Sequence, residues 1–139
     1  MLFQKGDYEN AILRHQKALE IYERALGPSH VSVAGTYGNI ANVLDSQGKF
    51  EEALEMHQKA LDIQVKCLGL EHASVADTKY NMALVYMQQG AHAQARRLFS
   101  EAASIYSEAL GPTNSKTLNA LRKVQATGSI PVSGCCTTS

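Results

Sequence analysis

The sequence has no excess of charge, since 13 Lys and Arg residues balance 13 Asp and Glu residues. Without a summed positive field there is little to attract phosphates, so we expect no nucleic-acid partner. No apolar run is long enough to span a bilayer or to act as a signal peptide, which predicts a cytoplasmic protein without a membrane partner. The three cysteines, Cys67, Cys135 and Cys136, form no metal-binding pattern and favour a reducing compartment.

Aromatic residues are scarce, and tryptophan is absent. The 45% of hydrophobic residues is nevertheless ordinary for a soluble helical protein, so we expect a folded chain. Its 139 residues are enough for one domain with a sizeable core and too few for two domains of ordinary size.

Two glycine series recur along the chain at one interval. The pair Leu-Gly ends at Gly27, Gly69 and Gly111, and a second series consists of Gly6, Gly48 and Gly90, so both series advance by 42 residues. Between these glycines GDYENAILRHQKALEIYERALG aligns with GKFEEALEMHQKALDIQVKCLG and GAHAQARRLFSEAASIYSEALG. Such self-similarity at a fixed period is the signature of a repeat architecture.

Apolar residues at helical spacing predict two helices for each repeat. We call A helices those that follow the Leu-Gly pair and B helices those that end at it. Gly27, Gly69 and Gly111 should end the B helices in the left-handed conformation, and Gly48 and Gly90 should form the tight turn from an A helix to the next B helix. His30 and His72 should shape the turn between repeats. The helices are expected near 7–26, 31–46, 50–68, 74–88, 92–110 and 115–126.

The small and aromatic positions of these repeats resemble those of tetratricopeptide repeats. They are Ala41, Gly48, Phe50, Ala53 and Ala60, repeated as Ala83, Gly90, His92, Ala95 and Ala102. The longer period, with LGPSHVSVAGTYGNIA and LGLEHASVADTKYNMALVY, is similar to the extended repeat of kinesin light chains. The resemblance implies an all-α fold, a right-handed superhelix (α-solenoid) of antiparallel helix-turn-helix repeats.

The repeat register divides the chain into an array and a tail. The array is expected over 1–126, with a partial repeat at 1–27, full repeats at 28–69 and 70–111, and a terminal helix at 112–126. The segment 127–139 is small and polar and contains Pro131, which predicts a flexible tail.

The resemblance implies a scaffold or adaptor that binds a peptide segment of another protein in a concave groove lined by A helices, including kinesin-light-chain-like cargo recognition. Asn39 and Asn81 match the second Asn of an Asn pair in the family motif, whereas Gly38 and Tyr80 replace the first. The expected groove residues lie on A helices away from the core stripe: Asn39, Asn42, Asp45, Asp77, Tyr80, Asn81, Leu84, Gln88 and Arg122. Amides, carboxylates and an aromatic ring suit recognition of a peptide, although a solvated face would have the same composition.

Several residues allow more than one interpretation. Arg122 could pair with an acidic group of the peptide, or it could belong to a polar helix that caps the array. His15 and His57 stand where the family has an aromatic ring and are interpreted as packing residues, because no further metal ligands occur at suitable spacing. No catalytic motif, cofactor site or metal site is found, so an enzyme is not expected. A lipid-anchored adaptor is the alternative, because the chain ends in a Cys136 box of prenylation length with atypical threonines inside it.

The first helix, 7–26, lacks the A helix that should precede it. Tyr8, Ile12, Leu19, Ile21 and Tyr22 make this helix rich in apolar surface. Uncovered apolar surface favours association, so we expect self-association through this helix or fraying of it.

Overall fold

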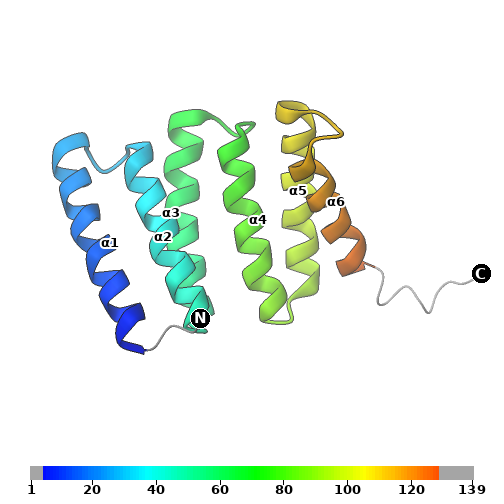
Figure 1. Ribbon diagram of the computed structural model, residues 1–139. Helices are drawn as coiled ribbons and strands as arrows, with labels where there is room; N and C mark the ends of the chain where they lie inside the picture. Colours follow the sequence, from blue (N-terminus) through cyan, green and yellow to red (C-terminus); the bar gives the residue numbers. More distant parts are fainter. Residues whose placement is uncertain (1–4, 129–139) are drawn as a thin grey trace, which may run out of the picture. The chain divides into compact units, whose positions relative to one another are not determined.

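The computed structural model describes residues 5–128, and these residues form six α-helices and no strand. They are α1 (Lys5–Leu26), α2 (Val31–Ser46), α3 (Phe50–Leu68), α4 (Ala73–Gln88), α5 (His92–Leu110) and α6 (Ser115–Gly128), shown in Figure 1. The predicted all-α repeat fold is confirmed. The tail from residue 129 onward, with Cys135 and Cys136, lies outside the described residues, so the structure does not test the lipid-anchor hypothesis.

Each helix begins and ends within about two residues of the positions predicted from the sequence, and the last helix continues past its predicted end at 126. Thr127 explains this extension, because only 5% of it is exposed. Its hydroxyl donates to the carbonyls of Lys123 and Val124, at 3.0 Å each. A threonine that would otherwise favour a turn is thus held in the final helical turn by burial and by these bonds.

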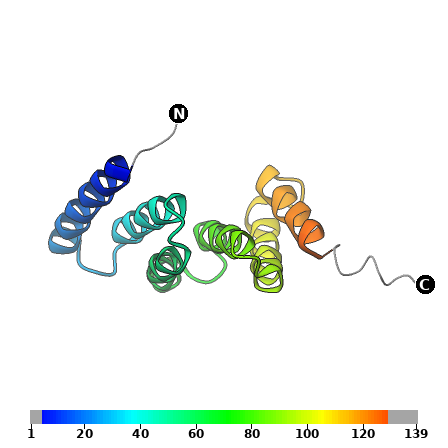
Figure 2. The ribbon, with the colours of Figure 1, turned by 90° about the horizontal axis from the view of Figure 1, so that it is seen from below.

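The described helices belong to two compact units, of which unit 1 ends at Leu70 and unit 2 begins at Glu71. In unit 1, α2 packs against both α1 and α3. In unit 2, α5 packs against both α4 and α6. Neighbouring helices within each unit run antiparallel (Figure 1), and Figure 2 shows the helices of each unit from below. The right-handed superhelix and the single array over 1–126 remain predictions.

The turn from an A helix to the next B helix is the same in both units. At Gly48, where φ is 82°, the Gly48 amide donates to the carbonyl of Asp45 and the Lys49 amide donates to the carbonyl of Leu44, both at 2.9 Å. Gly90, where φ is 83°, has the equivalent pair of bonds. These pairs form a Schellman motif, which requires a residue with positive φ after the helix. The predicted tight turns at both glycines are therefore confirmed.

The ends of the B helices differ from the prediction in one backbone angle. Gly69 and Gly111 have positive φ, 91° and 102°, but their ψ values are 159° and 151°. They therefore lie in an extended region that is open almost only to glycine, and the predicted left-handed helical conformation is wrong. Pro112 contributes to this at Gly111, because a following proline disfavours helical ψ. The extended ψ sends the chain away from the B helix toward the next A helix.

Histidines form the N-caps of both full A helices. The Nδ1 atom of His30 accepts a hydrogen bond from the Ser32 amide at 3.0 Å, and Nδ1 of His72 does the same for Ser74 at 3.0 Å. These bonds satisfy an amide that has no partner inside the first turn of the helix. The expectation that both histidines shape the turn between repeats is confirmed, and the cap supplies its chemistry.

Small residues let neighbouring helices approach closely. Ala41 and Ala53 are fully buried, and with Ile40 and Leu44 they form a core cluster between α2 and α3. Ile12 and Leu19 of α1 and Met56 of α3 pack against this cluster. Residues of this size bring helix backbones together, and the larger side chains fill the space beside them. One face of α1 is therefore held by the core of unit 1.

Candidate functional site

A cavity of about 330 Å³ opens in unit 2 among α4, α5 and α6. Its lining comes from all three helices and mixes charged, amide and aromatic groups. The lining residues are Asp77, Tyr80, Asn81, Tyr106, Lys116 and Asn119. Two A helices, α4 and α6, thus supply the walls, and the B helix between them contributes one tyrosine. A cavity of this size lies at the lower end of the range for ligand pockets, about 300–1,000 Å³, and can hold one or two side chains of a peptide.

Asp77 is the centre of the polar contacts in this cavity. The Tyr106 hydroxyl donates a hydrogen bond to Oδ1 of Asp77. The ammonium of Lys116 lies 3.2 Å from the same oxygen and 5.8 Å from the centre of the Tyr106 ring. The three groups come from three different helices, so the contacts tie α4, α5 and α6 together at the cavity. Because one cation and one carboxylate are paired, the lining has little net charge.

Tyr106 is held in its neutral, donating form. Only 3% of the residue is exposed, and burial raises the pKa of its phenol well above the ordinary value of 10.0. The hydrogen bond to Asp77 and the negative charge of that carboxylate raise the pKa further. All of these causes disfavour the phenolate, so the hydroxyl keeps its proton and continues to donate to Asp77.

Aromatic and amide groups complete the lining. The ring of Tyr80 meets the ring of the buried Phe99 edge to face, with 5.1 Å between centroids and 68° between planes. This contact fixes the ring of a half-buried residue at the cavity wall. Asn81 is half-buried, and Oδ1 of Asn119 accepts a hydrogen bond from Nη1 of Arg122 at 3.0 Å. The NH₂ group of Asn119 is thereby left free to donate to a bound group.

The structure brings together some of the predicted groove residues and not others. Asp77, Tyr80 and Asn81 line the cavity of unit 2. Arg122 is exposed and reaches the cavity only through Asn119. Besides Arg122, four predicted residues line neither this cavity nor the one in unit 1 described next: Asn42 and Gln88, which are exposed, and Asp45 and Leu84, which are half-buried.

A second cavity, of about 450 Å³, lies between α1 and α2 in unit 1 and contains the predicted residue Asn39. Its lining also includes Tyr22, Ser32 and Gly35. These three stand 84 residues before Tyr106, Lys116 and Asn119, so the two cavities share three positions of the repeat. In the described part of unit 1, Ser32 stands in place of Lys116, so the lysine of the polar network has no equivalent, and Gly35 stands in place of the amide of Asn119.

Sequence reasoning missed Tyr106 and Lys116 as parts of the site. Tyr106 belongs to a B helix, and only A helices were expected to line a groove. Lys116 lies in the first turn of α6, ahead of the residues that were considered on that helix. The available signal was the repeat of tyrosine at 22 and 106, which marks one B-helix position in two units.

The histidines expected to pack do so to different degrees. His57 is 1% exposed, whereas His15 is half-buried and lines the cavity of unit 1. Among residues 5–128, no three His, Cys, Asp or Glu side chains gather as a metal site would require. The helices in the same part of the chain include none long and apolar enough to cross a membrane.

Comparison with known proteins finds two kinds of similarity. The sequence profile described as Tetratricopeptide repeat matches residues 1–64 and 74–124. The fold is similar to the crystal structure of the nearly identical TPR-like repeats of a protein from Podosopora anserina assigned as a kinesin light chain. That chain has 22% identity and a TM-score of 0.76, with 89% of this chain and 59% of the other covered.

A similar match is BtubC (BKLC) from P. vanneervenii, with 20% identity, a TM-score of 0.74, and coverage of 93% of this chain and 56% of the other. A second crystal structure of the Podosopora anserina protein, that of a variant, matches with 22% identity, a TM-score of 0.75, and coverage of 89% and 58%. The chain thus spans less than two thirds of the length of these structures. No curated protein matches the chain significantly.

Proposed function

Because the chain belongs to the tetratricopeptide repeat family, we propose that it is a scaffold that binds a peptide segment of a partner protein along its A helices. The observation that carries this proposal is the cavity of unit 2, in which two A helices and one B helix present a neutralised carboxylate, two amides and a fixed aromatic ring. Both the family and the lining of this cavity support a binding function rather than a catalytic one.

The chemistry of the lining suits a peptide better than a charged small molecule. Asn81 and Asn119 can donate to and accept from the amide groups of a peptide backbone. The ring of Tyr80 offers an apolar wall for one side chain of the ligand. Asp77 is already paired with Lys116 and Tyr106, so a strongly charged ligand gains little from it. We therefore expect a polar or weakly charged peptide with one apolar anchor.

Kinesin-light-chain-like cargo recognition is one form of this function. The 42-residue period and the fold shared with the TPR-like repeats of a kinesin light chain support it. The expected partner is then a protein that exposes a short peptide segment.

The test uses the full chain and a phage-displayed library of unstructured peptides. Selected peptides should lose about tenfold in affinity when Asn81→Ala and Asn119→Ala are combined, since each amide hydrogen bond contributes about 0.5–1.5 kcal/mol. Asn10→Ala, an exposed amide of α1, is the matched control and should leave the affinity unchanged. Peptides that bind the double variant as tightly as the wild type would show that the cavity is not the binding site.

A further inference from the structure

The three A helices begin with the same kind of cap but not with the same residue. In each, a side chain before the helix accepts a hydrogen bond from the main-chain amide two residues later. The bonds join Nδ1 of His30 to Ser32 at 3.0 Å, Nδ1 of His72 to Ser74 at 3.0 Å, and Oδ1 of Asn114 to Lys116 at 2.9 Å. The three capping residues are 42 residues apart. One repeat position therefore has a titratable cap in two helices and a cap that does not titrate in the third.

Each histidine cap requires a neutral imidazole. Because the serine amide donates, Nδ1 must carry a lone pair, and the ring proton lies on Nε2. A second proton turns both nitrogens into donors and removes the cap. The positive charge that it adds is also unfavourable at the N-terminus of a helix. His30 is half-buried and His72 is exposed, and an imidazole changes charge between about pH 5 and 8, so mild acid should remove both caps.

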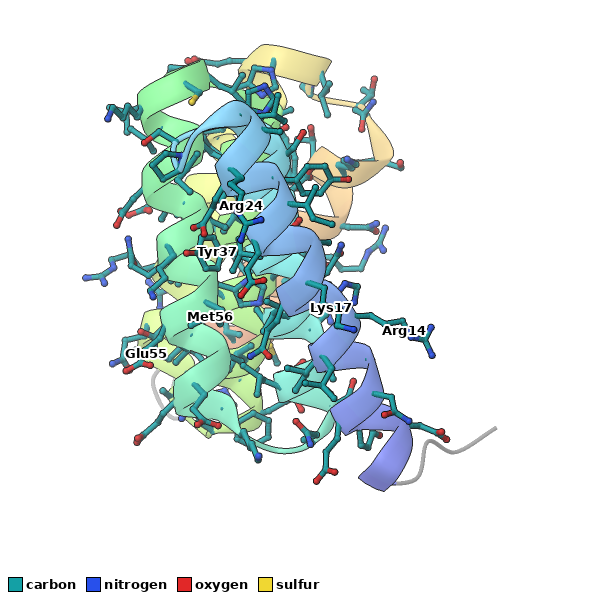
Figure 3. All side chains as sticks on the ribbon, turned by 90° about the vertical axis from the view of Figure 1, so that its left-hand side faces the viewer. Arg14, Lys17, Arg24, Tyr37, Glu55 and Met56 are labelled. Carbon is teal, nitrogen blue, oxygen red and sulfur yellow. The ribbon has the colours of Figure 1, made fainter. Side chains whose placement is uncertain are left out.

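The charged surroundings of the two histidines are mixed in sign. The ionisable groups at the same end of the packed elements are Glu23 and Arg24 of α1 with Lys66 and Cys67 of α3 for His30, and Glu71, Asp77, Glu108 and Lys116 for His72. Figure 3 labels Arg24, which lies in the last turn of α1 before the loop to His30. Within residues 5–128 neither imidazole forms an ion pair. Loss of the cap is therefore the main consequence of protonation.

In unit 2 the capped turn leads directly to the cavity. The amide of Ser74 donates to His72, and the carbonyl of Ser74 accepts a hydrogen bond from the Thr78 hydroxyl at 3.3 Å. The amides of Val75 and Ala76 donate to the carbonyl of His72. Asp77 follows this turn and holds the Tyr106 hydroxyl and the Lys116 ammonium in the cavity. Opening of the first turn of α4 thus displaces the segment that positions Asp77.

We propose that His72 is a pH-sensitive cap that keeps the first turn of α4, and with it Asp77, in place at neutral pH and releases this turn in mild acid. His30 acts in the same way on α2, whereas α6 stays capped by Asn114. Acid therefore loosens the wall of the cavity that α4 supplies and leaves the wall that α6 supplies in place. The consequence for peptide binding rests on the proposed function, whereas the opening of the turn does not.

The first test measures amide hydrogen exchange of the full chain by NMR at about pH 7.5 and 5.5. His72→Asn copies the cap of α6 and should fold, because asparagine is a favourable N-cap. Comparing the two proteins at the same pH cancels the intrinsic pH dependence of exchange. The ratio of the wild-type rate to the variant rate at Val75 and Ala76 should rise about fivefold from neutral pH to acid, the effect of losing one cap. A ratio that does not change with pH overturns the proposal.

Two further variants test whether the capping position itself is responsible. His30→Asn is the matched control, and it should leave the acid response of Val75 and Ala76 as in the wild type. Asn114→His should create a third acid-sensitive cap, so that the Leu118 amide, which donates to the carbonyl of residue 114, exchanges about fivefold faster than in the wild type at about pH 5.5. The proposal is overturned if His30→Asn and His72→Asn act alike on α4, or if Asn114→His leaves Leu118 unchanged in acid.

The second test concerns the cavity. Histidine-free peptides selected at neutral pH should bind the wild type about two- to fivefold more weakly at about pH 5.5, and His72→Asn should remove this loss. An equal loss in both proteins overturns the link between the turn and the cavity. If no peptide can be selected, the proposed function fails, but the ring signals of Tyr106 still decide the link. They should move with acid in the wild type and not in His72→Asn, and equal movement in both contradicts the link.

Discussion

His57 and Phe99 occupy the same buried position of successive B helices, and they are 1% and 0% exposed. The phenyl ring has no polar atom to satisfy, whereas Nε2 of His57 is buried without a hydrogen-bond partner in the described part of the chain. Burial lowers the pKa of His57, and the negative charge of Asp45 acts in the opposite direction. The buried imidazole nitrogen without a partner therefore lowers the stability of unit 1 relative to an apolar ring at the same position.

We expect His57→Phe to stabilise the protein. Removing a buried unpartnered nitrogen should raise the free energy of unfolding by about 1 kcal/mol, as measured by urea denaturation at neutral pH. The larger ring should find room, because Gly38 stands where Tyr80 meets Phe99 in unit 2. A decrease of more than about 1 kcal/mol would instead indicate that the site is too tightly packed for phenylalanine.

The same variant should alter the response to acid. The unfolded chain takes up a proton on His57 near the ordinary pKa of 6.5, and the folded chain takes it up only at lower pH. The free energy of unfolding should therefore fall as the pH drops below about 6.5, and His57→Phe should remove part of that fall. An acid-induced fall of the same size in His57→Phe and in the wild type would contradict this role of His57.

Two kinds of glycine should respond in opposite ways to alanine. Gly35 lies inside α2, and an added Cβ would meet nothing within 4 Å. Gly35→Ala should therefore stabilise the protein by about 0.5–1 kcal/mol. Gly48→Ala should destabilise it by about 1–2 kcal/mol, because φ is 82° there. Thermal unfolding of the two variants should show shifts of opposite sign, and a shift of the same sign would contradict the assigned turn geometry.

The repeat register made the helices predictable, whereas the cavity was much harder to predict. Gly48 and Gly90 marked the turns because a Schellman motif needs a positive φ wherever it occurs. The polar network could not be predicted in the same way, because Asp77, Tyr106 and Lys116 come from three helices and meet only through tertiary packing. Nor did the period reveal it, since Ser32 and Gly35 replace Lys116 and Asn119 in unit 1. Repetition predicts what the repeats share, and this site depends on where they differ.

Tyr106→Phe should weaken unit 2 by removing the hydrogen bond to Asp77. The expected loss is about 1 kcal/mol, measured by urea denaturation at neutral pH. Tyr22→Phe is the matched control in unit 1, because Tyr22 is 39% exposed and its hydroxyl can bond to water. If both variants lost the same free energy of unfolding, the hydrogen bond between Tyr106 and Asp77 would stabilise the protein no more than a hydrogen bond from Tyr22 to water.

Tyr106 should also make the protein sensitive to alkali. Its pKa is raised in the folded chain, so the folded state keeps a proton that the unfolded state releases near 10.0. The stabilisation is fully present below that pH and is lost as the pH rises above it. Burial and the nearby Glu23 also raise the pKa of Tyr37, so the ultraviolet titration of tyrosinate should show a delayed step to which both tyrosines contribute. Tyr106→Phe should reduce the amplitude of that step, and an unchanged amplitude in the variant would assign the step to other tyrosines.

Helix α1 should be the least protected B helix in the absence of a partner. In α3, Ala53, His57 and Ala60 are buried, whereas the side chains of residues 6–26 are all half-buried or exposed. Amides in a helix with little burial open locally at lower free energy than those in a packed helix. Hydrogen exchange followed by mass spectrometry should therefore be faster for 5–26 than for 50–68.

The exchange comparison is made on a monomer, because association of two copies through α1 would protect its amides from exchange. Equal exchange of α1 and α3 in a monomer would show that α1 does not open locally.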